Sequence, residues 1–187
     1  MKAWISLSMA AVFMWVMPQG EDAFAASPAY AETIAKEYPL KAAFLYNFAK
    51  FVEWPPESNP ETQGAFVIGI FGDDPFGRDI DELLGNKTIN NKKIIVERFL
   101  SLKEVRPCHI LFINSSEVKK LEDILDRLEG KSVLTVSETS LFTHNGGMIN
   151  FVMEDNKVRF EINKQATDKA GLRLSSQLLK LAKSVIA

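Results

Sequence analysis

The residues of this chain that could carry out chemistry are few. Two histidines and one cysteine among 187 residues leave most metal sites and thiol mechanisms without ligands or nucleophiles. The most suggestive group is the acidic pair Asp73 and Asp74, directly after the apolar run Phe66–Phe71. Because ligands of open α/β sheets bind beyond the carboxyl ends of strands, this pair could be half of a divalent-metal site. We favour the competing interpretation, a tight turn in which Asp74 caps a helix that begins at Pro75.

The same acidic pair would suit a receiver domain, which also needs a phosphoacceptor aspartate after its third strand. Here the third strand ends at Asn114-Ser115-Ser116, and an amide is neither ionised nor nucleophilic. The glycines of Gly69-Ile70-Phe71-Gly72 lack the G-x-G-x-x-G spacing, and the chain has no G-x-x-x-x-G-K-[ST] phosphate loop. The sequence therefore favours neither phosphoryl transfer nor a nucleotide cofactor.

Hydrolysis is also poorly supported, because the two histidines are badly placed to act as bases. His109 lies in an apolar strand, which is typical of a core histidine, and His144 lies in the polar loop 143–147. The chain has no G-x-S-x-G nucleophile elbow. We predict no catalytic residue, no metal ligand and no cofactor, and we keep an exported hydrolase that uses His144 as the third-ranked hypothesis.

A polar stripe near the C-terminus is the best candidate for a ligand site. Arg159, Glu161 and Asn163 alternate with apolar residues on one strand, and Asn150 projects from the expected partner strand. These groups could hold a small zwitterionic or anionic ligand by charge-assisted hydrogen bonds. The alternative is an ordinary solvated face of an edge hairpin.

Composition narrows the class of protein further. A net charge of -2, 47% hydrophobic residues and 25% charged residues are typical of a globular chain, and the near-neutral charge argues against a nucleic-acid partner. Cys108 cannot form a disulfide within the chain, since it is the sole cysteine. It is interpreted as a small buried hydrophobe, with an intermolecular disulfide as the alternative.

The first 25 residues have the layout of a cleavable secretory signal. Lys2 precedes fifteen residues without charge, and Ala23-Phe24-Ala25 provides small residues two apart. A membrane anchor would need about 20 apolar residues. We predict cleavage after Ala25, export of the mature chain, and a single α/β domain over residues 26–187, with an uncleaved anchor as the alternative.

The remaining elements are those that would position the candidate sites. A helix from Pro39 to about Trp54 carries the aromatic stripe Phe44, Phe48 and Phe51, which packs in the core or forms an interface. Strands and helices then alternate, which predicts a mostly parallel sheet flanked by helices. Later elements are expected as strands at 66–71, 94–99, 109–113 and 133–136, a helix at 117–129, a hairpin of 148–153 and 158–162 with a four-residue loop, and a final helix that carries Leu178, Leu181, Val185 and Ile186, capped by Ser175 or Ser176.

Several segments together resemble the YfiR-like (HmsC-like) family. The opening helix carries the family's first motif, and the later motifs follow in order over nearly the whole chain after the signal segment. The motifs are residues 41–55 (KAAFLYNFAKFVEWP), 68–77 (IGIFGDDPFG), 108–113 (CHILFI), 146–152 (GGMINFV), 158–163 (VRFEIN) and 172–176 (LRLSS).

The resemblance implies a periplasmic α/β protein, usually a homodimer, without known catalysis. Studied members of the family bind the periplasmic part of an inner-membrane diguanylate cyclase and hold it inactive. Release, aided by an outer-membrane lipoprotein, raises cyclic di-GMP and favours biofilm. Paired-cysteine redox control, seen in some members, cannot operate within one chain that has only Cys108.

We therefore expect a Rossmann-like three-layer sandwich that represses a membrane cyclase or sensor kinase by direct contact. A small-molecule binding module without catalysis is the alternative. Asn150, Arg159, Glu161, Asn163, Asp73 and Asp74 are the candidate ligand- or partner-binding residues.

Overall fold

The structure, a computed structural model, describes residues 28–56 and 64–186, with side chains in the first helix from Glu37 onward. The predicted signal segment, residues 1–25, lies outside the described residues. Within the described part, no helix is both long and apolar enough to cross a membrane.

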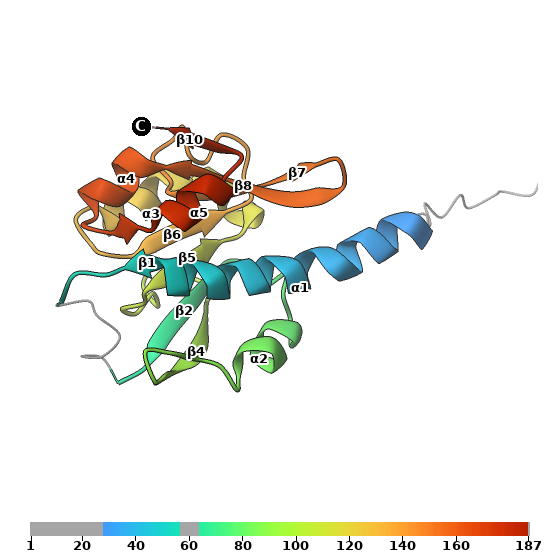
Figure 1. Cartoon of the computed structure of the whole chain (residues 1–187), viewed down its shortest axis with the longest axis horizontal. Coiled ribbons are helices and arrows are strands. Elements are labelled where there is room, and N and C mark those ends of the chain that lie inside the picture. Colours follow the sequence, from blue (N-terminus) through green and yellow to red (C-terminus); the bar gives the residue numbers. More distant parts are fainter. Residues whose placement is uncertain (1–27, 57–63, 187) are drawn as a thin grey trace, which may run out of the picture.

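A twisted sheet of eight strands forms the centre of the molecule (Figure 1). Its strand order is β10-β8-β7-β6-β5-β2-β4-β3, and β4, β2, β5, β6 and β7 run parallel. The antiparallel β7–β8 hairpin follows this parallel core, which confirms the predicted α/β class. The strands are β2 (Phe66–Phe71), β3 (Thr88–Ile89), β4 (Lys92–Phe99), β5 (Ile110–Ile113), β6 (Leu134–Ser137), β7 (Ile149–Glu154), β8 (Lys157–Asn163) and β10 (Ser184–Ile186).

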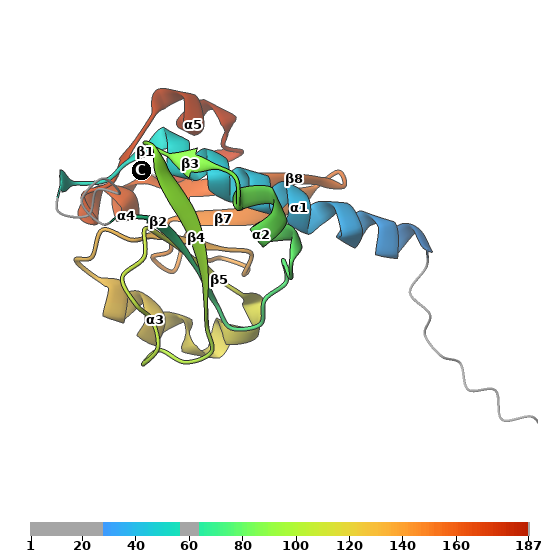
Figure 2. The same cartoon turned by 90° about the horizontal axis from the view of Figure 1, so that it is seen from below.

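Helices cover both faces of the sheet, as Figure 2 shows by the positions of α1 and α3 on opposite sides. The strands between them are buried on both faces, in keeping with their continuous apolar runs. A separate two-stranded antiparallel ribbon, β1 (Val52–Glu53) with β9 (Arg173–Leu174), joins the end of α1 to the C-terminal segment. The helices are α1 (Pro28–Phe51), α2 (Asp79–Leu84), the 3₁₀ helix η2 (Ser115–Lys120), α3 (Leu121–Leu128), α4 (Lys164–Lys169) and α5 (Ser176–Leu181).

The aromatic stripe of α1 packs into the larger of two apolar clusters. Phe44 and Phe48 contact Phe151 and Phe160 of the hairpin, with ring centroids 5.1–6.0 Å apart. Burying rings of this size stabilises the helix by packing rather than by propensity. The predicted core packing of Phe44 and Phe48 is therefore confirmed.

The start of the first helix was predicted wrongly. The helix begins at Pro28, and Pro39 lies inside it rather than at its first position. The preceding segment, AYAETIAKEY, is rich in alanine, glutamate and lysine, which are strong helix formers. An internal proline removes one backbone hydrogen bond, and the helix continues on both sides of it.

Two further helix boundaries differ from the prediction. The segment after Asp74 is a turn, and α2 begins only at Asp79, because Gly77 adopts a φ of +54° that no helix accommodates. The helix expected at 117–129 is a 3₁₀ turn from Ser115 followed by α3, and it buries Leu121 and Ile124 while Val118 is exposed.

The C-terminal half also contains two corrections. The hairpin turn has two residues, Asp155 and Asn156, both with positive φ, rather than the four-residue loop expected. The last helix ends at Leu181, and Val185 belongs to β10, which pairs with β8. Residues 184–186 pair with the edge of β8, and they could not do so if they continued the helix. The predicted Ser175 cap is confirmed, since its hydroxyl accepts from Leu178 N.

Candidate functional site

The carboxyl end of β2, where the chain order places a topological switch point next to β5, is closed by its own side chains. Gly72 adopts a φ of +88°, and a Cβ atom there would lie 2.6 Å from Glu117 Cγ and 2.8 Å from Ser116 Oγ. Asp73 N donates to Ser116 Oγ at 3.3 Å. We call Gly72–Asp74 with Ser116 and Glu117 the acidic corner. Within it, Ser116 and Glu117 fill the space that a Cβ atom on Gly72 would need.

Asp74 is engaged by the backbone of the turn and by Arg98. Its Oδ1 accepts from Phe76 N and Gly77 N at 2.8 and 3.2 Å, and its Oδ2 accepts from Arg98 Nε at 2.7 Å. Arg98 also donates to Asp81 Oδ2 at 2.6 Å. The hydrogen bond that Arg98 donates to Asp81 is the main influence that raises the pKa of Arg98 above its ordinary value, with Asp74 adding to it. The turn that we favoured over a metal site is thus present, although Asp74 does not cap α2.

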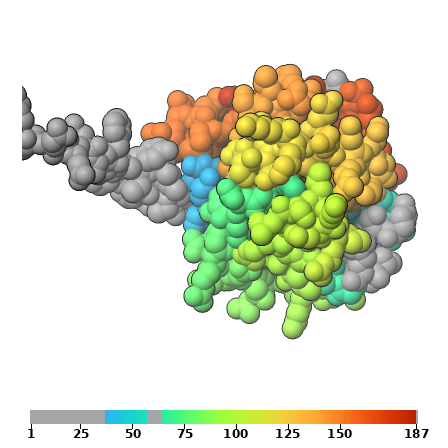
Figure 3. All heavy atoms as spheres, turned by 180° about the vertical axis from the view of Figure 1, so that it is seen from behind, coloured from blue at the N-terminus to red at the C-terminus, as the bar shows by residue number. Residues whose placement is uncertain are grey.

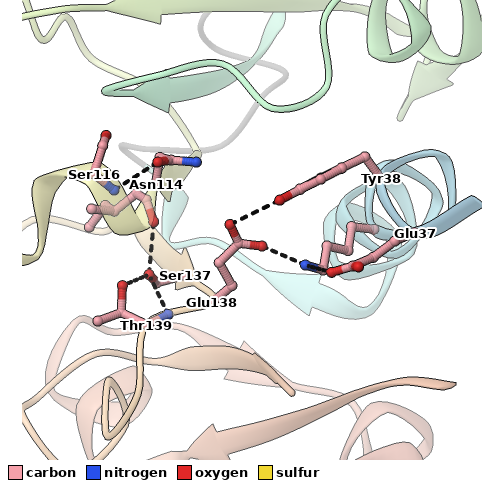
Figure 4. Close-up of polar contacts among 9 residues, drawn as sticks. Glu37, Tyr38, Asn114, Ser116, Ser137, Glu138 and Thr139 are labelled. Carbon is pink, nitrogen blue, oxygen red and sulfur yellow. Dashed lines mark hydrogen bonds and ion pairs between the residues drawn. The ribbon is translucent and has the colours of Figure 1, made fainter. Parts of the chain in front are cut away.

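The next strand ends carry a network of hydroxyl and amide groups (Figure 4). Asn114 Oδ1 accepts from Ser116 N at 2.8 Å and so caps η2. Ser137 Oγ lies 2.8 Å from the carbonyl oxygen of Ile113 and 3.0 Å from Thr139 Oγ1. These contacts fix the direction in which the chain leaves β5 and β6.

Beside this network, α1 contributes a buried cation. Lys41 is 3% exposed and forms ion pairs with Glu37 and with Glu138 Oε2, the latter at 2.5 Å (Figure 4). Tyr38 Oη donates to Glu138 Oε1 at 3.3 Å, and Lys41 Nζ lies 4.7 Å from the Tyr38 ring centroid. Two carboxylates with one ammonium leave this cluster with a net charge of -1.

A cavity of about 610 Å³ lies between this cluster and the projecting hairpin. Figure 3 shows the blue atoms of α1 between the orange hairpin and the green and yellow segments. We call this cavity the edge groove. It is lined by Glu37, Tyr38 and Lys41 of α1, by Ser115, Glu138 and Ser140 beyond β5 and β6, and by the four residues Asn150–Met153 of β7.

The predicted polar stripe is on one face of the hairpin, but its members have different partners. Asn150 lies opposite Glu161 in the β7–β8 register. Asn163 caps α4 through Oδ1 and donates from Nδ2 to Thr143 O at 2.7 Å. Arg159 Nε lies 3.8 Å from Glu154 Oε2 near the hairpin tip. Of the stripe, only Asn150 lines the edge groove, and ligand binding by the four residues remains a prediction.

The amide oxygen of Asn150 is the one member of the stripe with an unmet hydrogen bond. Asn150 is 3% exposed, and its Oδ1 has no hydrogen-bond partner among the described residues. A buried acceptor without a donor costs about 1–3 kcal/mol.

His109 and Cys108 are core residues. His109 Nδ1 accepts from Val67 N at 3.0 Å and its ring stacks on Phe66. Cys108 is 7% exposed, and burial raises the pKa of its thiol to about 12. A protonated, buried thiol is unreactive, which agrees with the interpretation of Cys108 as a small buried hydrophobe.

The comparison with known protein families agrees with the fold and with the sequence motifs. A family model described as YfiR/HmsC-like matches residues 38–183, which is most of the chain and all but a few of the described residues after the first half of α1. The chain belongs to the YfiR/HmsC-like family. Proteins of this family are periplasmic and regulatory rather than catalytic. A search of curated proteins found no significant match.

Family motifs lie on both sides of the edge groove. Lys41 is the first residue of the opening motif, and Asn150–Val152 end the fourth. Sequence reasoning missed Lys41 and Glu138 as a pair, because 97 residues separate them and neither has a local pattern that marks a buried ion pair. A lysine within the apolar stripe of α1 was the available signal.

Proposed function

We propose that this chain is a periplasmic regulatory binding protein that represses an inner-membrane signalling protein by direct contact. The target class is a diguanylate cyclase, with a sensor kinase as the second type. The observation that carries the proposal is the family match over residues 38–183. An open groove beside a projecting hairpin supports a function in binding.

The mechanism is a shift of populations. A repressor that binds the inactive conformation of its target more tightly than the active one moves the equilibrium by that difference in affinity. To change a target from 99% active to 99% inactive, the difference must be about 10⁴-fold. Competition by an outer-membrane lipoprotein, or a change in the repressor itself, would then restore activity. A homodimer would present two such binding surfaces.

The test is capture followed by an activity measurement. The exported chain is immobilised and exposed to detergent-solubilised inner membranes, and retained proteins are identified by mass spectrometry. We expect a cyclase or kinase with a periplasmic domain. Adding the chain to that protein in vesicles, on the side of its periplasmic domain, should lower production of cyclic di-GMP or phosphorylation. Retention of no such protein, or an unchanged activity, would contradict the proposal.

A second candidate function is the sensing of a small molecule. The observation that favours it is the edge groove, which Asn150 of the polar stripe lines. A thermal-shift screen of amino acids and nucleotides tests it, and Arg159→Ala should abolish the shift if the stripe binds the ligand. A stabilising ligand whose effect survives Arg159→Ala but not Asn150→Ala would place binding in the groove instead. No shift with any compound would argue against both sites.

A further inference from the structure

Strand β7 extends beyond the end of β6, its neighbour on one side. It pairs with β6 at only two positions, the last being Asn150 with Ser137, where β6 ends. Over Phe151–Glu154 the only pairing partner of β7 in the described chain is β8. One backbone edge of these four residues is therefore open, on the hairpin that projects from the body in Figure 1.

The register shows which backbone groups face this open edge. Residues opposed in an antiparallel pair alternate between exchanging hydrogen bonds and turning away from each other. Lys183 N donates to Phe160 O on the far side of β8, so Phe160 and its opposite residue Phe151 turn away from each other. Two residues on, Met153 has the same orientation. The N–H and C=O groups of Phe151 and Met153 thus point to the side of β6. Because Asn150 bonds to β8, its parallel pairing with Ser137 is made through its neighbours, and Phe151 N donates to Ser137 O. The groups left at the open edge are the C=O of Phe151 and the N–H and C=O of Met153.

A second bond gives the same alternation. Asn163 N donates to Met148 O at 2.8 Å, which makes Met148, and with it Asn150 and Val152, the residues of this strand that bond to β8. The open edge therefore offers one donor, the N–H of Met153, and two acceptors, the carbonyl oxygens of Phe151 and Met153, in the pattern that an added strand requires.

The edge groove runs along these groups. The consecutive residues Asn150–Met153 line one side of it, and Ser115 and Ser140 lie on the other. An added strand lies about 4.8 Å from its neighbour, and four residues of it span about 13 Å. Met153 is 45% exposed, so an apolar side chain of an added strand would find an apolar contact there.

The other open edge of the hairpin is protected by charge. On β8, the strand beside this edge, Lys157 and Arg159 are basic. Lys183, which lies between α5 and β10, adds a third basic group, with its Nζ 3.0 Å from Glu154 Oε1. Basic side chains on an edge are a common device against unwanted strand pairing. In the open stretch Phe151–Glu154 the one charged side chain is Glu154 at the hairpin tip, and the groove-lining residues Asn150–Met153 include none.

Charge selects the kind of strand that fits. Lys41 is shared by Glu37 and Glu138, so one negative charge of the cluster is not matched by a cation in the described chain. Glu138 Oε1 has only the long 3.3 Å bond from Tyr38 Oη. An ammonium or guanidinium group entering the groove would complete the pairing of this oxygen.

We propose that the open edge of β7 accepts an extended segment of a partner protein as an added strand. Main-chain bonds to Phe151 and Met153 hold the segment, and a lysine or arginine of the segment binds Glu138. This proposal rests on the proposed function, since it names the surface and the chemistry by which the partner is recognised.

The first test is amide hydrogen exchange of the full chain without a partner. The amide of Met153 should exchange at least about 100-fold faster than that of Val152, whose N–H is bonded to β8. Equal protection of both amides at every protein concentration would mean that another segment of this chain covers the edge. Protection of Met153 that rises with concentration would assign the edge to a second copy. Either result overturns the proposal.

The second test uses a display library of random 12-residue peptides selected on the full chain. Selected peptides should be rich in β-branched residues and contain a lysine or arginine. Met153→Pro removes an edge donor and should lower their affinity at least about tenfold, whereas Met153→Ala keeps that donor and should change it by less than about threefold. Glu138→Gln should lower it about tenfold, and Glu122→Gln, at an exposed acid of α3 outside the groove, by less than about twofold.

Failure to select any peptide, or peptides that bind all four variants equally, overturns the proposal. If Met153→Pro does not fold, the exchange rates and the pair Glu138→Gln with Glu122→Gln decide. The two proposals fail separately. A cyclase that is captured and inhibited equally by the Met153→Pro and parent chains would leave the proposed function intact and remove the added strand.

Discussion

The acidic corner and the edge groove lie on the same carboxyl edge of one sheet, yet one is filled and the other is open. At the corner, β2 and β5 end side by side, and Ser116 and Glu117 pack against Gly72. At the groove, β6 ends at Ser137 while β7 continues to Glu154, and a cavity of about 610 Å³ remains beside it.

The difference shows that strand order alone does not locate a binding site. A switch point offers a crevice only if the loops that follow the two strands diverge. Here η2 starts at Ser115 and turns back over β2, so its first residues occupy the crevice. Unequal strand lengths create the space instead, two strands farther along. The two regions also differ in their ion pairs, buried at the groove and largely exposed at the corner.

The largest effect is expected from Lys41→Met, which removes the cation of the groove. Glu37 and Glu138 would then be two neighbouring carboxylates without a counter-ion, in a setting where Lys41 is 3% exposed. Removing one partner of a buried ion pair costs about 3–5 kcal/mol in the free energy of unfolding. Urea denaturation measures this loss.

Lys50→Met is the matched control on the same helix, because Lys50 is exposed and lies 5.6 Å from the Tyr46 ring. Its loss should be at most about 1 kcal/mol. Equal losses in the two variants would mean that the groove cluster contributes no more than a surface contact, and the contrast between the two regions would disappear.

A smaller effect is expected from Gly72→Ala, which tests whether the corner is filled. The substitution meets both a φ of +88° and two side-chain atoms within 2.8 Å. Left-handed strain costs about 1–2 kcal/mol and overpacking adds about 1 kcal/mol or more. We expect a loss of about 2–3 kcal/mol in the free energy of unfolding, measured by urea denaturation.

Gly130→Ala isolates the strain, since Gly130 has a φ of +71° and no atom within 4 Å of an added Cβ. Its loss should be about 1 kcal/mol. If the two alanine variants are equally stable, Ser116 and Glu117 yield easily and the corner is not a closed part of the sheet.

The sheet was predictable because its strands have strong local signals. The apolar runs at Phe66–Phe71 and Ile110–Ile113 are covered on both faces in the structure, as continuous apolar runs in parallel sheets are. The predicted boundaries failed where backbone conformation decided the outcome, as at Gly77, or where a distant strand edge competed with a helix, as at Val185.

The groove was not predictable, because nothing local encodes the lengths of β6 and β7 relative to each other. Asn150 was singled out as a ligand-binding residue, and it lines the groove, but its neighbours there come from α1 and from the loop after β6. Alternation along one strand identifies which residues share a face. It does not tell which residues of other elements complete the site.

The smallest effect is expected from Asp81→Asn, which asks whether charge or turn geometry closes the corner. Arg98 bonds to both Asp74 and Asp81, and Asp81 is half exposed. Exposed pairs contribute about 0.2–1 kcal/mol, so the loss in the free energy of unfolding should be about 0.5 kcal/mol, and it should vanish in 1 M salt, where screening acts over about 3 Å.

Asp79→Asn controls for the helix dipole, because Asp79 lies in the same first turn of α2 and has no ion pair among the described contacts. Only the excess loss of Asp81→Asn over Asp79→Asn reports on Arg98. A large excess that persists in salt would mean that the corner is held by a desolvated ion pair like that of the groove. A small excess loss that disappears in salt would mean that the turn at Asp74 and the packing at Gly72 close the acidic corner. Neither of these two contributions depends on salt.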